Sequence, residues 1–237
     1  MLKLKRLKTL TCLLLVLAAL LMPVCAAEPP AITSAAAILY EVKSDEILFE
    51  YNADVQRYPA STTKLMTAVV ALENGNLTDT VTVSQSALDG LPERGSSVFL
   101  IAGEEMSFSD MLNYLLVASG NDAANALAEH VAGSVDNFVA MMNEKAAELG
   151  CTGTHFANPH GLHDENHYTT ARDLLYIARY AMQNPTITEI VAKPQIELAP
   201  TNKHAESTTL TTTNHLLTRI RRSEYYYPSA IGIKTGF

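Results

Sequence analysis

The most constraining stretch of the sequence is an almost wholly apolar run without charge, residues 65–72, directly after Ser61, Thr62, Thr63 and Lys64. A helix at the surface carries a polar stripe, and this run has none. The sequence therefore predicts a helix that is buried on all sides. Gly75 follows the run and suits a left-handed residue that closes the helix. The fold must then wrap its other elements around this segment.

Ser61 and Lys64 are three residues apart, so they lie on one face of that helix, one turn from each other. A serine hydroxyl becomes a good nucleophile when a neighbouring base removes its proton. Apolar surroundings and the positive end of the helix dipole disfavour the ammonium form of Lys64, so its neutral amine can be that base. Unpaired N–H groups at the same helix end can stabilise an oxyanion. Taken alone, the spacing also fits a plainer interpretation, in which the hydroxyl residues cap the helix and Lys64 extends to solvent.

Residues 1–26 have the pattern of a secretory signal peptide: a basic start, an apolar stretch over residues 10–22, and small residues at the cleavage site. The apolar stretch is too short to span a membrane. We expect cleavage after Ala26 or Ala27; a lipoprotein cut before Cys25 is the minor alternative, disfavoured by Pro23. The mature domain would occupy residues 27–237. It would be exported to the periplasm or to the outer face of the cytoplasmic membrane and the cell wall.

The charge of the mature chain bears on its partners. Removing the signal peptide would leave 13 basic against 25 acidic residues, a net charge of about −12. Nucleic acid is therefore not expected as a partner, because phosphate binding needs a basic face. Cys151 would be the one remaining cysteine, so we expect no disulfide within the chain, and Cys151 itself should be a small buried residue.

Hydrophobic periodicity predicts a mixed α+β domain. Runs at 35–42 and 47–51 flank a polar turn and indicate a hairpin, and shorter strands are expected at 81–83, 196–198 and 207–210. Helical spacing predicts helices at 108–117, 122–131, 134–149 and 171–182, the last closed by Asn184-Pro185. Residues 230–237 indicate a final strand. We expect an antiparallel sheet flanked by helices, a mostly helical lobe over about residues 84–184, and a site between them.

Two further motifs carry polar side chains suited to a cleft. Ser119-Gly120-Asn121 falls in the break between two predicted helices, and Lys234-Thr235-Gly236 ends the final predicted strand. Gly236 would let the backbone approach a ligand closely. The patterns S-x-x-K, S-x-N and K-T-G each occur once, in that order.

With these motifs the chain resembles the serine-type D-Ala-D-Ala carboxypeptidases, low-molecular-mass penicillin-binding proteins related to the class A β-lactamases. The loop Ala157-Asn158-Pro159-His160-Gly161-Leu162 and the context Ser119-Gly120-Asn121-Asp122-Ala123-Ala124 are also typical of that family. The resemblance extends over about residues 35–237. It implies a β-lactamase/transpeptidase-like fold and an enzyme without cofactor or metal.

The resemblance also implies how the site would act on a peptidoglycan stem peptide that ends in D-Ala-D-Ala. Ser61 would attack the carbonyl carbon of the penultimate D-alanine, with Lys64 as the base and Ser119 as a proton relay to the leaving amine. The terminal D-alanine would leave, and water would hydrolyse the acyl-enzyme. Penicillins and other β-lactam antibiotics would be covalent inhibitors.

The remaining motif residues would bind the substrate. Asn121 would hold the substrate amide, while Lys234 and Thr235 would bind the terminal carboxylate. Lys234 would also place a second positive charge near Lys64 and lower its pKa further. Gly236 would line the cleft, and the oxyanion hole would be the backbone N–H groups of Ser61 and Phe237.

Two other functions are kept as alternatives. A serine β-lactamase of class A needs a glutamate to activate water, and its E-x-x-N pattern after S-x-N is absent here. A non-catalytic sensor of penicillin or muropeptides would have little use for an intact Ser61 and Lys64.

Four histidines crowd one loop: His155, His160, His163 and His167. The H-E-x-x-H arrangement of zinc peptidases is missing, so we expect solvated loop histidines and no metal site.

The sequence stops at Phe237, directly after K-T-G. The family that it resembles continues there with more strands of the sheet, a closing helix, often a further domain, and an amphipathic membrane anchor. We therefore expect a catalytic domain truncated at its C-terminus, which folds poorly and acylates weakly because its last strand leaves edge groups unpaired. Any membrane association would depend on a C-terminal segment absent from this chain.

Overall fold

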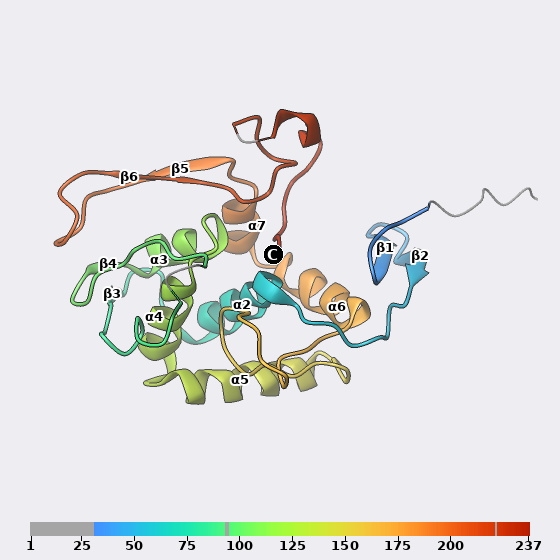
Figure 1. Ribbon diagram of the computed structural model, residues 1–237, viewed down its shortest axis with the longest axis horizontal. Coiled ribbons are helices and arrows are strands. Elements are labelled where there is room, and N and C mark those ends of the chain that lie inside the picture. The colour runs from blue at the N-terminus through green and yellow to red at the C-terminus, as the bar shows by residue number, and fades with distance from the viewer. Residues whose placement is uncertain (1–30, 93–94, 221) are drawn as a thin grey trace, which may run out of the picture. The chain divides into compact units, whose positions relative to one another are not determined.

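Three short strand pairs and a set of helices make up the fold (Figure 1). The computed structural model describes residues 31–92, 95–220 and 222–237. The strands are β1 (Ala37–Glu41), β2 (Glu46–Tyr51), β3 (Thr80–Thr82), β4 (Glu105–Ser107), β5 (Gln195–Leu198) and β6 (Thr208–Thr211). The helices are η1 (Ala60–Thr63), α2 (Lys64–Asn74), α3 (Phe108–Leu116), α4 (Asn121–Ala132), α5 (Val135–Glu148), α6 (Ala171–Ala181), α7 (Pro185–Val191) and η2 (Ser223–Tyr225).

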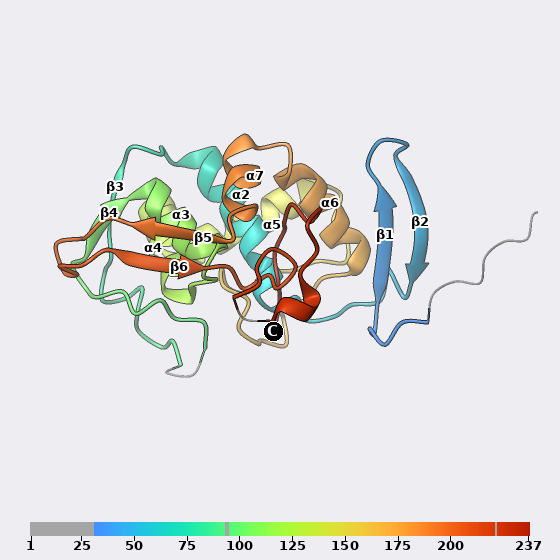
Figure 2. The same ribbon diagram turned by 90° about the horizontal axis from the view of Figure 1, so that it is seen from above.

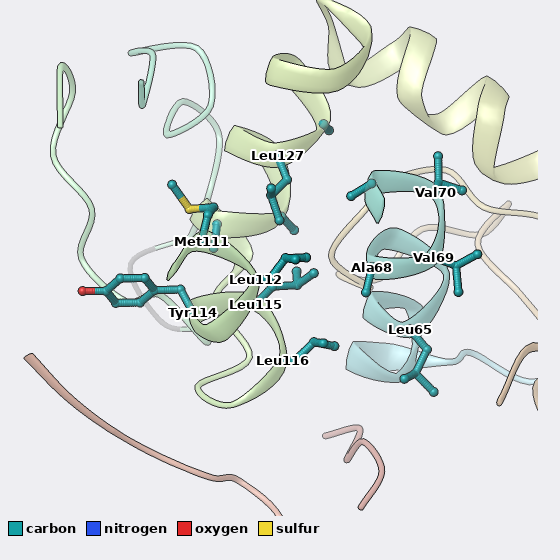
Figure 3. Packing of buried hydrophobic residues seen from close by; sticks show 14 of the residues in the cluster. Leu65, Ala68, Val69, Val70, Met111, Leu112, Tyr114, Leu115, Leu116 and Leu127 are labelled. Carbon is teal, nitrogen blue, oxygen red and sulfur yellow. The ribbon is translucent and has the colours of Figure 1, made fainter. Parts of the chain in front are cut away.

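Helix α2 is the centre of the core. Residues 64–71 of this helix are all buried, and α2 contacts α3, α4, α5 and α6. In Figure 3, Leu112, Leu115 and Leu116 of α3 point toward α2. Each fully buried aliphatic side chain of this kind contributes about 1.5–3 kcal/mol relative to an exposed one. The prediction of a helix buried on all sides is confirmed.

The strands form three separate antiparallel pairs, β1–β2, β3–β4 and β5–β6. The mixed α+β class is confirmed, but the described strands are not joined into the one antiparallel sheet that we expected. Strand β4 was not predicted, because Glu105-Met106-Ser107 contains no β-branched or aromatic residue. The β5–β6 hairpin lies along α3 in both views (Figures 1 and 2).

Capping residues begin three of the described helices within one residue of the predicted starts. The side chains of Ser107, Ser134 and Thr170 accept the backbone N–H groups of the first turns of α3, α5 and α6. These bonds satisfy N–H groups that would otherwise lack a partner. Gly133 closes α4 in the left-handed conformation, with φ 76°.

Two predicted helix ends differ from the structure. Gly75 closes α2 in an extended conformation, with φ −112°, rather than a left-handed one. A Cβ there would lie 2.5 Å from the ring of Phe108, so glycine is needed for close packing instead. Asn184-Pro185 ends the segment after α6, but it also begins α7, because Asn184 accepts the N–H groups of Thr186 and Ile187.

The predicted final strand at residues 230–237 is wrong, because no strand is assigned there. The side chains of Thr213 and Asn214 bond to this segment at Thr235 and Gly232 in place of a backbone ladder. The segment nevertheless runs to the N-terminal end of α2, where Phe237 lies in both views (Figures 1 and 2).

Within the described ranges, none of the helices is both long enough and apolar enough to cross a membrane. The predicted signal peptide, residues 1–26, lies outside the described residues.

Candidate active site

Ser61 lies in η1, a single 3-10 turn that leads directly into α2. No side chain caps either helix: the hydroxyls of Thr62 and Thr63 instead donate to the carbonyls of Pro59 and Ala60. The plainer interpretation of this stretch as an ordinary N-cap is therefore wrong. Lys64 does not extend to solvent either, because it is 0% exposed.

The Lys64 amine is surrounded by three oxygen atoms. Nζ lies 2.7 Å from Asn121 Oδ1, 2.6 Å from the His160 carbonyl oxygen and 3.1 Å from Ser61 Oγ. The first two atoms can only accept hydrogen bonds. A neutral amine has two hydrogens for these two acceptors, and its lone pair then faces the Ser61 hydroxyl. The geometry therefore suits removal of the Ser61 proton.

Burial lowers the pKa of Lys64 well below its ordinary value, and the positive charge of Lys234 lowers it further. The Asp122 carboxylate opposes this effect but does not cancel it. A charged group with no exposed surface is costly, so this burial disfavours the ammonium form.

The turn between α3 and α4 supplies the opposite wall of the site. Ser119 has φ 66°, an uncommon conformation for a residue other than glycine, and such strain often marks a functional position. The Gly120 N–H donates to the Tyr114 carbonyl at 3.0 Å, and the Asn121 N–H donates to the Ser96 carbonyl at 2.7 Å. These bonds fix the turn, so the Asn121 amide is aimed at Lys64.

Asp122 holds the neighbouring loop against this turn. Its buried carboxylate accepts the backbone N–H groups of Val98 and Leu100 and the hydroxyl of Ser97. The contacts of Asp122 were not predicted, although the residue belongs to the context Ser119-Gly120-Asn121-Asp122-Ala123-Ala124. Its only sequence signal is a negative charge in the first turn of α4.

Lys234 reaches the same turn from the other side. Its Nζ donates to Ser119 Oγ at 2.8 Å, and burial lowers the pKa of Lys234 to about 8. The Thr235 hydroxyl is 2.6 Å from that of Thr213, a residue that the sequence analysis missed. A Cβ on Gly236 would lie 3.0 Å from the Pro59 carbonyl oxygen, so this segment passes directly over η1. Phe237 is 86% exposed.

The loop between α5 and α6 forms the floor beside Ser61. Gly161 has φ 92°, and a Cβ there would lie only 1.9 Å from the Ala60 carbonyl oxygen. The Asn158 side chain accepts the Gly161 N–H at 2.7 Å and so fixes this close approach. The loop was predicted as typical of the resembled family, but its contact with Lys64 through the His160 carbonyl was not.

The expectation of four solvated histidines is wrong for two of them. His160 and His167 are 8% and 1% exposed. Burial lowers the pKa of His160 to about 3 and that of His167 to about 4, so both are neutral near pH 7. Among the described residues, no group of three or more histidine, cysteine or acidic side chains is arranged to hold a metal ion.

Together these contacts join all three motifs around one turn. Lys64 bonds to Ser61 and Asn121, Lys234 bonds to Ser119, and Gly236 lies against η1. Such an arrangement offers a nucleophile, a neutral base and a separate cation that can bind a carboxylate. It can carry out acyl transfer to serine.

Comparisons with known proteins find similar sequences. The sequence profile of the family described as D-alanyl-D-alanine carboxypeptidase matches residues 23–237. The D-alanyl-D-alanine carboxypeptidase DacF of Bacillus subtilis is 36% identical over 206 residues, which cover 85% of this chain and 50% of that protein. The D-alanyl-D-alanine carboxypeptidase DacA of Haemophilus influenzae is 40% identical over 161 residues, which cover 66% of this chain and 41% of that protein. The chain thus spans half or less of the length of these two relatives.

The fold is also similar to solved structures. The crystal structure of the Streptomyces K15 DD-transpeptidase superposes with a TM-score of 0.79 at 33% identity, covering 88% of this chain and 81% of that one. A D-alanyl-D-alanine carboxypeptidase from Mycobacterium tuberculosis superposes with a TM-score of 0.79 at 33% identity, covering 92% of this chain and 78% of that one.

Proposed function

The chain belongs to the D-alanyl-D-alanine carboxypeptidase family, and from this membership we propose that it is a serine peptidase that removes the terminal D-alanine from peptidoglycan stem peptides. The observation that carries the proposal is the Lys64 amine. In its neutral form this amine has two acceptors for its two hydrogens, which leaves its lone pair for the Ser61 hydroxyl, whose Oγ is 3.1 Å away.

In the proposed acylation step, Ser61 Oγ bonds to the carbonyl carbon of the penultimate D-alanine while its proton passes to Lys64. The carbonyl oxygen becomes an oxyanion that accepts the backbone N–H groups of Ser61 and Phe237. The C–N bond then breaks, and the nitrogen of the departing D-alanine takes a proton by way of Ser119. The product is an ester between the shortened peptide and Ser61.

Substrate binding in this proposal uses the opposite end of the site. Lys234 and Thr235 bind the terminal carboxylate, for which an ammonium group and a hydroxyl are suitable donors. Asn121 receives the substrate amide, and Gly236 allows the peptide to lie close to the backbone. Water hydrolyses the ester and regenerates Ser61.

β-Lactam antibiotics would react with Ser61 in the same way and form a long-lived acyl-enzyme. The stem peptide lies outside the cytoplasmic membrane, so the proposal also places the protein there. Residues 1–26 would direct export as a signal peptide.

Intact-mass analysis after exposure to penicillin tests the nucleophile. The wild-type chain should gain the mass of one penicillin, whereas Ser61→Ala should gain none. Ser207→Ala is a matched control, because Ser207 lies at the β5–β6 hairpin and bonds to Glu197. An adduct of equal yield on Ser61→Ala would remove Ser61 from its role.

Release of D-alanine from a diacyl-tripeptide ending in D-Ala-D-Ala tests turnover. We expect release by the wild-type chain and none by Ser61→Ala. A penicillin adduct without any release of D-alanine would favour a sensor over an enzyme.

A further inference from the structure

His167 lies outside the three motifs, yet it contacts the turn that carries the nucleophile. It belongs to the loop between α5 and α6 and is almost completely buried. Its ring Nδ1 accepts the Ala157 N–H at 3.0 Å, and its Nε2 lies 2.7 Å from the Thr63 hydroxyl oxygen. The ring therefore connects the backbone of its own loop to η1.

The direction of each hydrogen bond follows from the Ala157 contact. A backbone N–H can only donate, so Nδ1 must carry no proton. The neutral ring then has its hydrogen on Nε2 and donates it to Thr63 Oγ1. The Thr63 hydroxyl in turn donates to the Ala60 carbonyl oxygen at 2.8 Å. The result is an ordered chain from Ala157 through His167 and Thr63 to Ala60.

The end of this chain is the peptide group that joins Ala60 to Ser61. A peptide group is planar, so fixing its carbonyl oxygen also fixes the direction of its N–H. That N–H belongs to Ser61 and is one of the two proposed oxyanion donors. Ala60 has φ 48°, a conformation that alanine rarely adopts without support from its surroundings. A hydrogen bond accepted by the carbonyl also polarises the N–H of the same peptide group.

We propose that His167, acting through Thr63, is a positioning residue that orients the Ala60–Ser61 peptide so that the Ser61 N–H faces the developing oxyanion. The inference rests on the proposed function, because only an acyl-transfer step needs this donor. Its effect belongs to the transition state, so the loss of His167 should lower kcat and leave KM for the peptide unchanged.

Two substitutions separate this role from simple packing. In His167→Gln the side-chain NH2 reaches the position of Nε2, so the bond to Thr63 is kept while the bond from Ala157 is lost. In His167→Asn the side-chain oxygen reaches the position of Nδ1, so the bond from Ala157 is kept while the bond to Thr63 is lost. We expect His167→Gln to retain most of the wild-type kcat and His167→Asn to lose about tenfold. The loss of an entire oxyanion donor lowers kcat by about 100-fold to 1000-fold, and a donor that points in the wrong direction causes part of that decrease.

A double-mutant cycle tests whether the effect passes through Thr63. Thr63→Val keeps the shape of the side chain but removes the hydroxyl, and it should lower kcat by a similar factor, whereas Thr63→Ser should restore it. The double variant His167→Asn/Thr63→Val should be no slower than Thr63→Val alone, because both changes break one chain of bonds. Melting temperatures of all variants show whether a loss of kcat merely follows a loss of stability.

The outcomes are distinct. A wild-type chain that forms no penicillin adduct and releases no D-alanine would overturn the proposed function and this inference with it. Three results with an active wild type would overturn the inference alone. The first is a kcat of His167→Asn equal to that of the wild type, and the second is a kcat of His167→Gln below that of His167→Asn. The third is that the effects of His167→Asn and Thr63→Val on kcat are additive.

Discussion

Replacing Gly161 with alanine is the most direct test of how the loop between α5 and α6 supports the nucleophile. The new Cβ would lie 1.9 Å from the Ala60 carbonyl oxygen and 3.0 Å from the Ser61 nitrogen. Carbon and oxygen atoms in close contact are ordinarily about 3.3–3.6 Å apart, so one backbone must move by more than about 1 Å. A displacement of that size at a reacting group costs about 100-fold in rate. The positive φ adds about 1–2 kcal/mol of strain.

Gly133→Ala is the matched control, because Gly133 also has a positive φ, 76°, but no atom lies within 4 Å of a Cβ there. Both variants should lose stability from strain, at about 2–4 °C of melting temperature for each kcal/mol. Only Gly161→Ala should acylate slowly. The rate constant for labelling by a fluorescent penicillin, measured beside a thermal melt, separates the two effects. Equal labelling rates for the two variants would show that Gly161 does not govern the position of Ser61, and the reasoning would be wrong.

Lys234→Met should move the acidic limb of the pH profile for acylation to higher pH. In the proposed reaction the active form of Lys64 is the neutral one, and removing the positive charge of Lys234 lets the pKa of Lys64 rise. The rate of penicillin labelling as a function of pH checks this, and a limb that stays in place or moves to lower pH would contradict the electrostatic coupling. Cys151 should resist a maleimide while the chain is folded, because burial raises the pKa of its thiol to about 12, and it should react once the chain is denatured. Modification at Cys151 itself in the native chain, at the rate of a free thiol, would mean that this side chain is not buried in the core.

Local signals predicted most of the helices. Capping residues and a regular apolar period act over one or two turns, so α3, α4, α5 and α6 begin and end within a residue or two of their predicted bounds. Helix α7 was missed because Asn184-Pro185 was interpreted only as a stop. The same pair is also a good start, since asparagine caps a helix and proline suits its first turn.

The final segment shows that local sequence does not determine whether a strand finds a pairing partner. Residues 230–237 have the β-rich composition of a strand, but a strand exists only with a partner, and partners are set by long-range packing. The K-T-G motif marked Lys234 all the same, because a motif reflects chemistry rather than secondary structure.

The motif residues of the site could be predicted from the sequence, but the backbone groups that contact them could not. Ser61, Lys64, Ser119, Asn121 and Lys234 stand in recognisable patterns. The roles of backbone atoms, such as the His160 carbonyl that accepts from Lys64, leave no trace in side-chain identity. Their contacts depend on how the chain folds over itself.

The enclosure of Lys64 has a consequence for the path of the proton. Because the amine has no exposed surface, it cannot exchange protons directly with bulk water. Of its three hydrogen-bond partners, the amide oxygen of Asn121 and the carbonyl of His160 carry no hydrogen to pass on, whereas the Ser61 hydroxyl does. A proton taken up by this amine must therefore leave toward the reacting centre itself, where in the proposed reaction the departing nitrogen would receive it.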